Sequence, residues 1–484
     1  MSGFLLLSPL LIRFSIAIVL MFSWRKIRLQ RFISVLGEVI ALCLATITFQ
    51  QVLAEGASSM QAGGWLAPYG ITLVVDSLAA LLLLVTSIIG LGVSLFAAGS
   101  MLNSRLRFGF FPIYHLLLLG ISGAFLAGDI FNLYVWFEVM IISSFVLLTL
   151  GGERAQIEGA VKYFTLNFLA SVVFLTGLAV LYGLTGSLNM ADLSLKLPLV
   201  AQRSLVDVCA FIFFIAFGIK AAVFPLYFWL PASYHTPPTA VTAVFGGLLT
   251  KVGIYAMLRV FTLMFPWDAF LAGLFQLVAV LTILAGAFGA LSKQHLVKSI
   301  SWLIICHIGF MLAGLATHNQ ESLAGTIFYM THDMLVKAAL FLMSGITYRL
   351  LATHLFGKAG GLFSQHPAWS LLFAVPLFAL VGIPPLSGFW PKISLLSGMA
   401  AAGNWLLFAM VLFGSLVTLV VAFRYFEDYP VIKRRAMGAG MVMVVFASLL
   451  LVAAAPRMYV WCHHMAANLL NPAAYLQLVL PQSP

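Results

Sequence analysis

The sequence predicts an all-α polytopic membrane protein with about 14 transmembrane helices. Hydrophobic residues make up 63% of its 484 positions, and charged residues make up only 8%. The mean hydropathy is +1.09, whereas soluble globular domains are far more polar, with about a quarter of their residues charged. Apolar runs of about 20 residues, the length that crosses a bilayer, recur from one end of the chain to the other.

These runs predict the individual spans. They lie at 4–23, 32–53, 71–97, 109–127, 131–150, 160–182, 205–230, 239–262, 269–291, 296–316, 322–350, 369–398, 405–425 and 436–455. The longest connections are each about twenty residues long, which leaves no room for a soluble domain. The first run contains Arg13 and lacks a small-residue cleavage site, so we expect a retained helix rather than a signal peptide.

Basic residues are distributed unevenly between the two sides. Loops after odd-numbered spans hold most of them: Arg25, Lys26, Arg28, Arg31, Arg105, Arg107, Arg154, Lys293, Lys298, Arg349, Lys358, Lys433, Arg434 and Arg435. Loops after even-numbered spans hold only Lys196, Arg203 and Arg259. Because cytoplasmic loops are rich in lysine and arginine, both termini are predicted to lie outside the cell membrane. Anionic headgroups then account for the formal net charge of +11, and no nucleic-acid partner is needed.

No metal or cofactor chemistry is predicted. The four cysteines, Cys43, Cys209, Cys306 and Cys462, show no CxxC or metal-ligand spacing. The sequence contains no nucleotide-binding glycine loop, Walker sequence, flavin motif or haem motif. We therefore expect neither a disulfide, nor a metal site, nor cofactor-dependent catalysis.

Two lysines lie deep in neighbouring spans, Lys220 in the seventh and Lys251 in the eighth. Placing an ammonium in hydrocarbon costs roughly 2.5–3.5 kcal/mol, so such lysines usually face a protein interior or a hydrated cavity. Pro225 should break the seventh span just after Lys220, because proline lacks a backbone donor and clashes with the carbonyl of Ala221. Broken backbone at this depth is tolerated only where it is buried or lines water. Together these features indicate a pathway for charge.

Glu138 lies about two helical turns inside the fifth span, with no basic residue on the same helix. A carboxyl group at that depth is either protonated or paired with a cation from another helix. Lys220 and Lys162 are its candidate partners. Lys162 can instead reach the headgroups, or pair with Glu158 four residues earlier.

The first three spans contain one acidic residue that we single out, Asp76, which we interpret as a solvated carboxylate at a helix end. Asp129, at the outer boundary of the fifth span, is interpreted as an interfacial charge. We expect the first three spans to serve as scaffold or to contact a partner.

Two histidines are candidate proton relays. His235 lies in a turn forced by Pro231, Pro237 and Pro238 at the predicted cytoplasmic mouth, where it is either a relay or an ordinary loop histidine. His307 lies at mid-depth in the tenth span, and there we favour a relay over a structural role.

The eleventh span, TIFYMTHDMLVKAALFLMSG, has the most charged interior. Asp333 and Lys337 are four residues apart and share a helix face, close enough to pair. His332 points about 100° away from Asp333. The group is either a self-neutralising ion pair that fixes packing, or the middle of a hydrophilic axis.

The twelfth span repeats the arrangement of the seventh. Pro384 and Pro385 should break it, Pro391 should break it again, and Lys392 follows directly. Two broken spans five apart suggest an inverted duplication, as in many transporters. The predicted units are residues 1–108, repeats at 109–262 and 269–425, and 426–484 with the last helix and a C-terminal tail.

Four motifs together form a specific signature: DIFNLYVWFEVM, KAAVFPLYFWLPASYHTPPTAVTA, LLTKVGIY and GIPPLSGFWPK. Over about residues 70–425 the chain resembles the proton-translocating family shared by respiratory NADH:quinone oxidoreductase and the Mrp-type cation/proton antiporters. Its length, its first motif and its lysine in the twelfth span most resemble the D-type subunits of the Mrp branch.

The resemblance implies fourteen helices, two inverted five-helix repeats and broken helices 7 and 12. It also implies roles for single residues. Glu138 and Lys220 would form a controlling ion pair, Lys251 the central relay and Lys392 the exit lysine. His332 and Lys337 would link the two halves, whereas Asp333 departs from the family's usual pattern.

The function expected from these features is proton translocation within a multisubunit antiporter that exchanges protons for Na⁺ or another monovalent cation. The expected partners are other membrane subunits. One alternative is a proton-pumping subunit of a respiratory NADH:quinone oxidoreductase or membrane-bound hydrogenase, with the same transport residues. A second is a scaffold subunit whose charges form only structural ion pairs.

Overall fold

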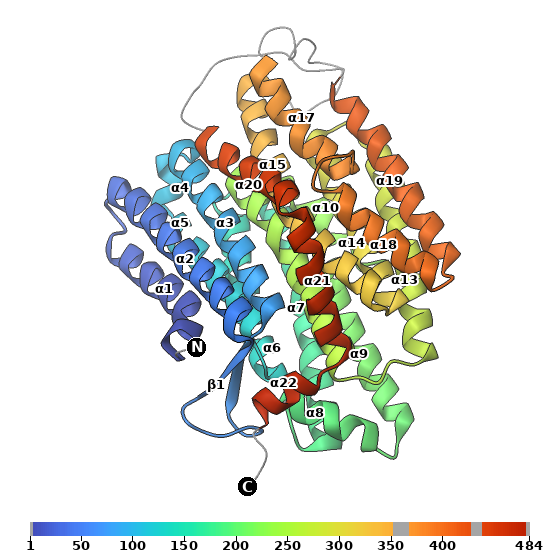
Figure 1. Ribbon diagram of the computed structural model, residues 1–484. Coiled ribbons are helices and arrows are strands. Elements are labelled where there is room, and N and C mark those ends of the chain that lie inside the picture. The colour runs from blue at the N-terminus through green and yellow to red at the C-terminus, as the bar shows by residue number, and fades with distance from the viewer. Residues whose placement is uncertain (1–2, 352–366, 427–437, 481–484) are drawn as a thin grey trace.

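The computed structural model describes residues 3–351, 367–426 and 438–480 and is a helical bundle with one small β-hairpin (Figure 1). Within these residues, 11 helices are long and apolar enough to cross a membrane, or up to 12 if a bent pair is one span. Shorter apolar helices at Phe110–Leu126 and Leu371–Val381 lie among them. The predicted all-helical, multi-pass class is confirmed. Lys358, Lys433, Arg434 and Arg435 lie outside the described residues.

The elements of the first half are α1 (Gly3–Phe22), α2 (Ile27–Glu55), β1 (Ser58–Ala62), β2 (Ile71–Val75), α3 (Ser77–Ser100), α4 (Asn103–Arg107), α5 (Phe110–Leu126), α6 (Ile130–Thr149), α7 (Arg154–Thr185), α8 (Met190–Lys196), a 3-10 turn (Leu197–Leu199), α9 (Arg203–Ala221), α10 (Trp229–Ser233), α11 (Thr239–Val244), a π turn (Phe245–Leu249) and α12 (Thr250–Leu263). Those of the second half are α13 (Ala269–Leu291), α14 (Leu296–Thr317), α15 (Gln320–Leu351), α17 (Pro367–Val381), α18 (Phe389–Ala401), α19 (Trp405–Phe426), α20 (Gly438–Ala453), α21 (Ala455–Leu470) and α22 (Ala473–Val479).

The two ends of the bundle differ. The antiparallel hairpin β1–β2, α8 and α22 gather at one end, which we call the hairpin face (Figure 1). At the opposite end, α4 carries Arg105 and Arg107. Arg31, just after the α1–α2 connection, bonds to Asn103 of α4, and Arg105 pairs with Glu153 before α7. We call this end the basic face.

The centre of the bundle is formed by α11–α12 and α15. Every residue in the most apolar stretch of each is buried, whereas less than half of the corresponding stretches of α1, α7, α13 and α19 is buried. These outer helices expose large apolar side chains such as Phe14, Phe168 and Phe288, as expected of helices that face lipid or other subunits. A charged group within the buried stretches of α12 and α15, such as Lys251 or Lys337, is therefore shielded by protein on all sides.

The predicted helix breaks are present. α9 ends at Ala221, the next residue has φ 63°, and α10 begins only at Trp229, whose indole nitrogen donates to the carbonyl of Ile219 at 2.8 Å. α17 ends at Val381, and α18 begins at Phe389. The expected further break at Pro391 is wrong. This proline lies in the first turn of α18, where backbone N–H groups have no partner within the helix.

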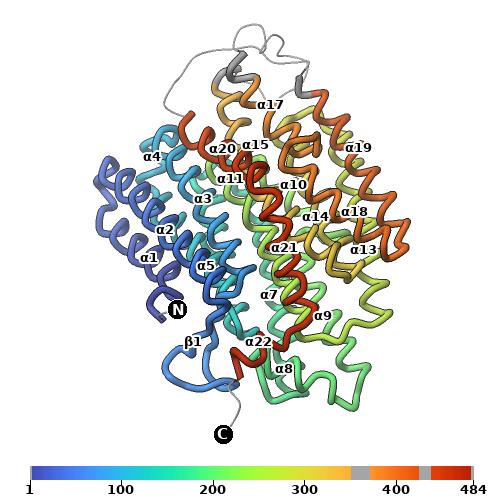
Figure 2. The backbone as a smooth tube through the Cα atoms, viewed as in Figure 1, coloured from blue at the N-terminus to red at the C-terminus, as the bar shows by residue number. Residues whose placement is uncertain are grey.

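The stretch predicted as a C-terminal tail is helical. α20 and α21 meet at an angle of 80°. α21 then runs along the outside of the central helix α15 toward α22 at the hairpin face (Figure 2). The apolar pattern ends near residue 455 because α21 carries polar residues on its outward side. Its buried residues, including Met458, Cys462 and Met465, form a narrow stripe.

Candidate functional site

Four helices contribute side chains to a buried cluster in the centre of the bundle. Lys251 of α12 places its Nζ 2.8 Å from Oδ2 of Asp333 on α15. The other carboxylate oxygen, Oδ1, lies 3.2 Å from Nδ1 of His307 on α14, and Nε2 of His307 lies 3.1 Å from the hydroxyl of Thr418 on α19. All four side chains have 0% exposure. The cluster therefore links α19 to the three central helices through groups shielded from bulk water.

The sequence before Lys251 explains how these groups meet. Residues 245–249, FGGLL, form a π turn, and the carbonyl of Gly246 accepts from Lys251 Nζ at 2.7 Å. π turns of this kind occur frequently at functional sites. A Cβ at Gly246 would clash with the ring of Phe341 on α15. The absence of a side chain there lets α15 approach closely, which brings Asp333 within reach of Lys251.

Lys337 follows Asp333 by one helical turn, but the two side chains do not form the ion pair that was one of the two interpretations of this span. The oxygens of Asp333 face Lys251 and His307 instead. Lys337 is fully buried, and its Nζ has no hydrogen-bond partner among the residues that the structure describes. The centre of α15 thus carries an ammonium group without a carboxylate of its own.

Lys392 is held by the second helix break. Its Nζ donates to the carbonyls of Val381 at 2.6 Å and Leu380 at 3.2 Å, which the end of α17 leaves free. His332 of α15 lies beside the same break, with Nδ1 2.9 Å from the hydroxyl of Ser387 and with no partner at Nε2. The broken backbone therefore supplies neutral ligands for one predicted site residue and orients another.

Lys220 lies in the last turn of α9, at the first break. Its Nζ is 3.4 Å from the hydroxyl of Ser171 and 4.9 Å from the centre of the Phe137 ring. A cavity of about 20 Å³ beside it, lined also by Asn167 and Tyr163, is large enough for about one water molecule. Lys220, like Lys392, is thus buried without a carboxylate in direct contact.

Glu138 does not contact Lys220 directly. It lies half-buried on α6, its Oε1 has no hydrogen-bond partner, and no ion pair is formed by it among the described residues. Lys162, the other candidate partner, pairs with Glu158 at 2.6 Å on the exposed side of α7. The predicted pairing of Lys162 with Glu158 is therefore present.

His235 lies at the edge of a cavity of about 720 Å³ on the basic face. Charged residues of several segments line this cavity, including Arg105, Glu153 and Arg349. The Nδ1 of His235 is 3.0 Å from the carbonyl of Pro231. Burial, together with the nearby charge of Lys298, lowers the pKa of His235, so the imidazole facing this cavity is neutral at neutral pH.

Asp76 and Asp129 are more constrained than predicted. Asp76 lies at the start of α3 as predicted and caps it by accepting from the backbone of Ala79, but its carboxylate is paired with Arg259 at 2.5 Å rather than free in solvent. Arg259 itself, assigned to a loop from the sequence, is buried on α12. Asp129 caps α6 at Asn132 and is only 8% exposed.

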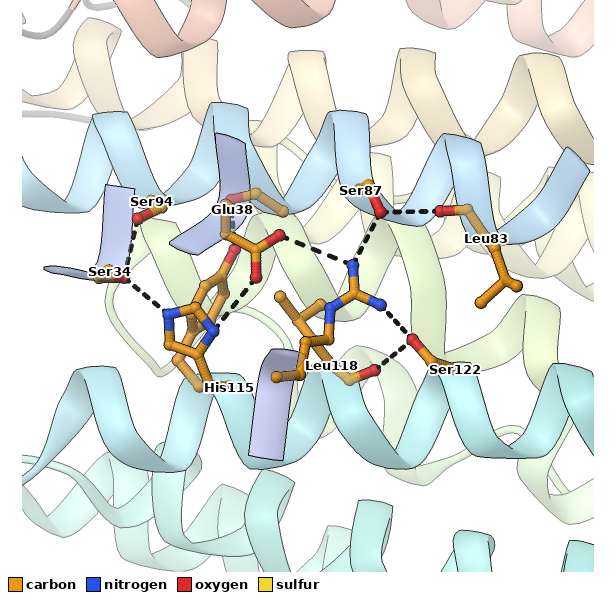
Figure 3. A network of polar contacts seen from close by, with 11 residues as sticks. Ser34, Glu38, Leu83, Ser87, Ser94, His115, Leu118 and Ser122 are labelled. Carbon is orange, nitrogen blue, oxygen red and sulfur yellow. Dashed lines mark hydrogen bonds and ion pairs between the residues drawn. The ribbon is translucent and has the colours of Figure 1, made fainter. Parts of the chain in front are cut away.

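A second buried charge cluster lies among α1, α2, α3 and α5, and the sequence analysis missed it (Figure 3). Arg13 lies 3.6 Å from Oε2 of Glu38, and Nδ1 of His115 lies 3.2 Å from Oε1. Hydroxyl groups surround these three side chains: Ser34 bonds to Nε2 of His115 and to the hydroxyl of Ser94, and Ser87 and Ser122 accept from Arg13. Ser34 and Glu38 on one face of α2, beside a span containing Arg13, were the available signal.

Comparisons with known proteins identify the family of this chain. The sequence pattern of the family described as NADH:quinone oxidoreductase/Mrp antiporter, transmembrane, matches residues 127–418. A protein from Bacillus subtilis, named as the D-type subunit of a Na(+)/H(+) antiporter, is 39% identical over 494 aligned positions, covering 100% of both chains.

Two solved assemblies contain similar chains. A chain of the Mrp complex from Dietzia sp. DQ12-45-1b has a TM-score of 0.92 at 27% identity and covers 99% of this chain and 100% of its own. A chain of an archaeal membrane-bound sulfane sulfur reductase has a TM-score of 0.89 at 27% identity, covering 98% and 99%. The chain described here therefore belongs to the NADH:quinone oxidoreductase/Mrp antiporter transmembrane family.

Proposed function

We propose that this protein is the proton-translocating subunit of a multisubunit Na⁺/H⁺ antiporter. The full-length likeness to the Bacillus subtilis antiporter protein and the likeness to a chain of an Mrp complex support both the activity and the assembly with other membrane subunits. In this proposal the protein is part of an ion transporter and uses no cofactor.

The observation that carries the proposal is a surplus of buried cations. Lys220, Lys251, Lys337 and Lys392 are at most 6% exposed, and among them Lys251 alone is within ion-pair distance of a carboxylate of the described residues. Because a buried ammonium without a counter-charge is unstable, such a group either loses its proton or depends on the charge state of its neighbours. A row of them can therefore pass protons in steps.

In the mechanism we propose, Lys251 and Lys337 share one proton and compete for one carboxylate, that of Asp333. When the proton passes from Lys251 to a neutral Lys337, Asp333 turns from Lys251 to Lys337, and the proton then moves on by way of His332 to Lys392. Glu138 acts on Lys220 from a distance in this structure and would approach it in another state. One charge that crosses 100 mV corresponds to about 2.3 kcal/mol. Interactions between neighbouring buried charges are of a similar size and can therefore control the transfer.

The proposal includes the finer architecture. Counting α5, the pair α17–α18 and the bent pair α20–α21 as spans extends the 11 long helices toward fourteen. The breaks after Lys220 and before Lys392 support two inverted repeats at residues 109–262 and 269–425. The positive-inside rule places the basic face in the cytoplasm of a bacterial cell and the hairpin face, with both termini, outside.

The test is Na⁺-dependent proton movement in proteoliposomes that contain the copurified complex. Wild type should exchange the two ions, whereas the Lys337→Met complex should assemble with the same partners and exchange none. Normal exchange by Lys337→Met would contradict the proposal. Copurification with iron–sulfur subunits would favour the alternative of a respiratory or hydrogenase complex. Loss of assembly in every lysine variant would favour the scaffold alternative.

A further inference from the structure

One face of α12 carries three polar residues at four-residue intervals: Lys251, Tyr255 and Arg259. Residues four apart lie above one another on a helix, so Arg259 is about 12 Å further along the axis than Lys251. Tyr255 is 1% exposed, and Arg259 is 5% exposed. The line begins at the central cluster and ends near the hairpin face.

Arg259 is tightly held at the end of this line. Its Nη2 lies 2.5 Å from Oδ2 of Asp76, and its Nε donates to the hydroxyl of Tyr255 at 3.4 Å. The guanidinium group also packs against the rings of Tyr255 and Tyr475, at 5.5 and 5.4 Å from the ring centres. The hydroxyl of Tyr255 donates to the carbonyl of Phe125 at 2.8 Å. These contacts fix the guanidinium to α3, α12 and α22.

A cavity of about 230 Å³ opens on the other side of this arginine. It is lined by Asp76, Arg259 and Tyr475, by Asn468 near the end of α21, and by Asn471 just after that helix. A polar cavity of this size admits several water molecules. Arg259 therefore separates a hydrated cavity on the hairpin face from the helix face that leads to Lys251.

We propose that Arg259, clamped by Asp76, is an electrostatic seal that stops protons from passing between the hairpin-face cavity and Lys251. A guanidinium group stays protonated at any physiological pH and cannot relay a proton by losing its own. Its fixed positive charge repels hydronium and metal cations, as arginines do in other selective pores.

The seal has a consequence for the direction of transport. With the path along α12 closed, a proton on Lys251 has one ionised neighbour, Asp333, which lies sideways on α15. Protons are then directed across the bundle toward Lys337 and Lys392 instead of leaking along α12. This inference depends on the proposed function, because a seal matters only if Lys251 exchanges protons.

The test measures passive proton leak through the intact complex in proteoliposomes that lack the exchanged cation. Valinomycin and K⁺ hold the membrane potential constant, and a pH-sensitive dye inside the vesicles reports proton entry. Arg259→Gln should raise the leak about tenfold, the factor for a barrier lowered by about 1.4 kcal/mol. Arg259→Lys keeps a positive charge and should stay near the wild-type leak. In Arg259→Gln/Lys251→Met the leak should return to the wild-type level.

Three results would overturn the seal: an assembled Arg259→Gln complex with wild-type leak, an equal leak in Arg259→Lys, or a leak that persists in the double variant. If Arg259→Gln does not assemble, the charge-neutral double variant Asp76→Asn/Arg259→Gln replaces it. This variant removes both charges of the ion pair together and should also raise the leak about tenfold, an effect of roughly 1.4 kcal/mol, and an unchanged leak overturns the seal. The proposed function is tested by a different measurement: normal Na⁺ exchange by the Lys337→Met complex would contradict it, whatever the leak through Arg259→Gln.

Discussion

The Arg13 cluster and the Lys251 cluster are both buried, yet they are built on opposite principles. In the first, the single cation Arg13 faces the single carboxylate Glu38, and hydroxyl groups surround the pair. In the second, the carboxylate of Asp333 faces Lys251, while Lys337 one turn away has no hydrogen-bond partner within the described part of the chain. A balanced pair is stable as it stands, whereas surplus cations create a group whose charge can change. We therefore assign the first cluster to the fold and the second to transport.

The largest effect should come from unbalancing the first cluster. Glu38→Gln leaves the charge of Arg13 buried without a counter-charge and should destabilise the protein by about 3–5 kcal/mol. The thermal unfolding temperature of the purified complex measures this loss. Exchange per assembled complex should stay near wild type.

The matched control is Arg13→Met/Glu38→Leu, which removes both charges. Replacing a buried ion pair by apolar groups is often neutral or stabilising, so the double variant should recover most of the stability. A stable Glu38→Gln single variant would show that the balance of charge in this cluster does not matter.

The next effect concerns titration in the second cluster. Lys337→Arg keeps a positive charge but cannot release a proton at physiological pH, so exchange should fall at least about 100-fold, as when a proton-transfer group is lost. Dye-monitored exchange measures the rate, and the yield of assembled complex is the control. Wild-type exchange by an assembled Lys337→Arg complex would mean that charge alone is required.

A smaller effect is expected at Glu138, which has an unpartnered carboxyl oxygen and no direct contact with Lys220. Glu138→Gln should leave the unfolding temperature unchanged and slow exchange about tenfold, an effect of roughly 1.4 kcal/mol. Loss of assembly in this variant would instead assign Glu138 to the fold, like Glu38.

The smallest effect should be at the exposed pair of Lys162 and Glu158. Lys162→Met removes one partner of a solvated ion pair and should cost less than about 1 kcal/mol. Exchange should stay within about twofold of wild type, a difference of roughly 0.4 kcal/mol. A large loss of exchange would place Lys162 on the transport route.

The sequence predicted what depends on one helix at a time. Apolar runs located the membrane helices, and Pro225, Pro384 and Pro385 located the breaks beside Lys220 and Lys392. Burial of the lysines followed from their depth in apolar runs.

Partners on other helices were not predictable in the same way. Helical spacing puts Lys337 beside Asp333, but helix packing decides which neighbouring helix comes closest. The glycines before Lys251 let α12 approach α15, so that Asp333 pairs with Lys251. The ion pair between Asp76 and Arg259 joins positions 183 residues apart, and no local pattern reports it. Glu38 was missed because its counter-charge lies on another span.

The most direct test compares Na⁺/H⁺ exchange per assembled complex in two charge-neutral double variants. Lys251→Met/Asp333→Asn removes the pair of the second cluster, and Arg13→Met/Glu38→Leu removes the pair of the first. The account predicts that the former abolishes exchange and the latter preserves it, with both complexes assembled. Normal exchange by Lys251→Met/Asp333→Asn would contradict the assignment of transport to the central cations.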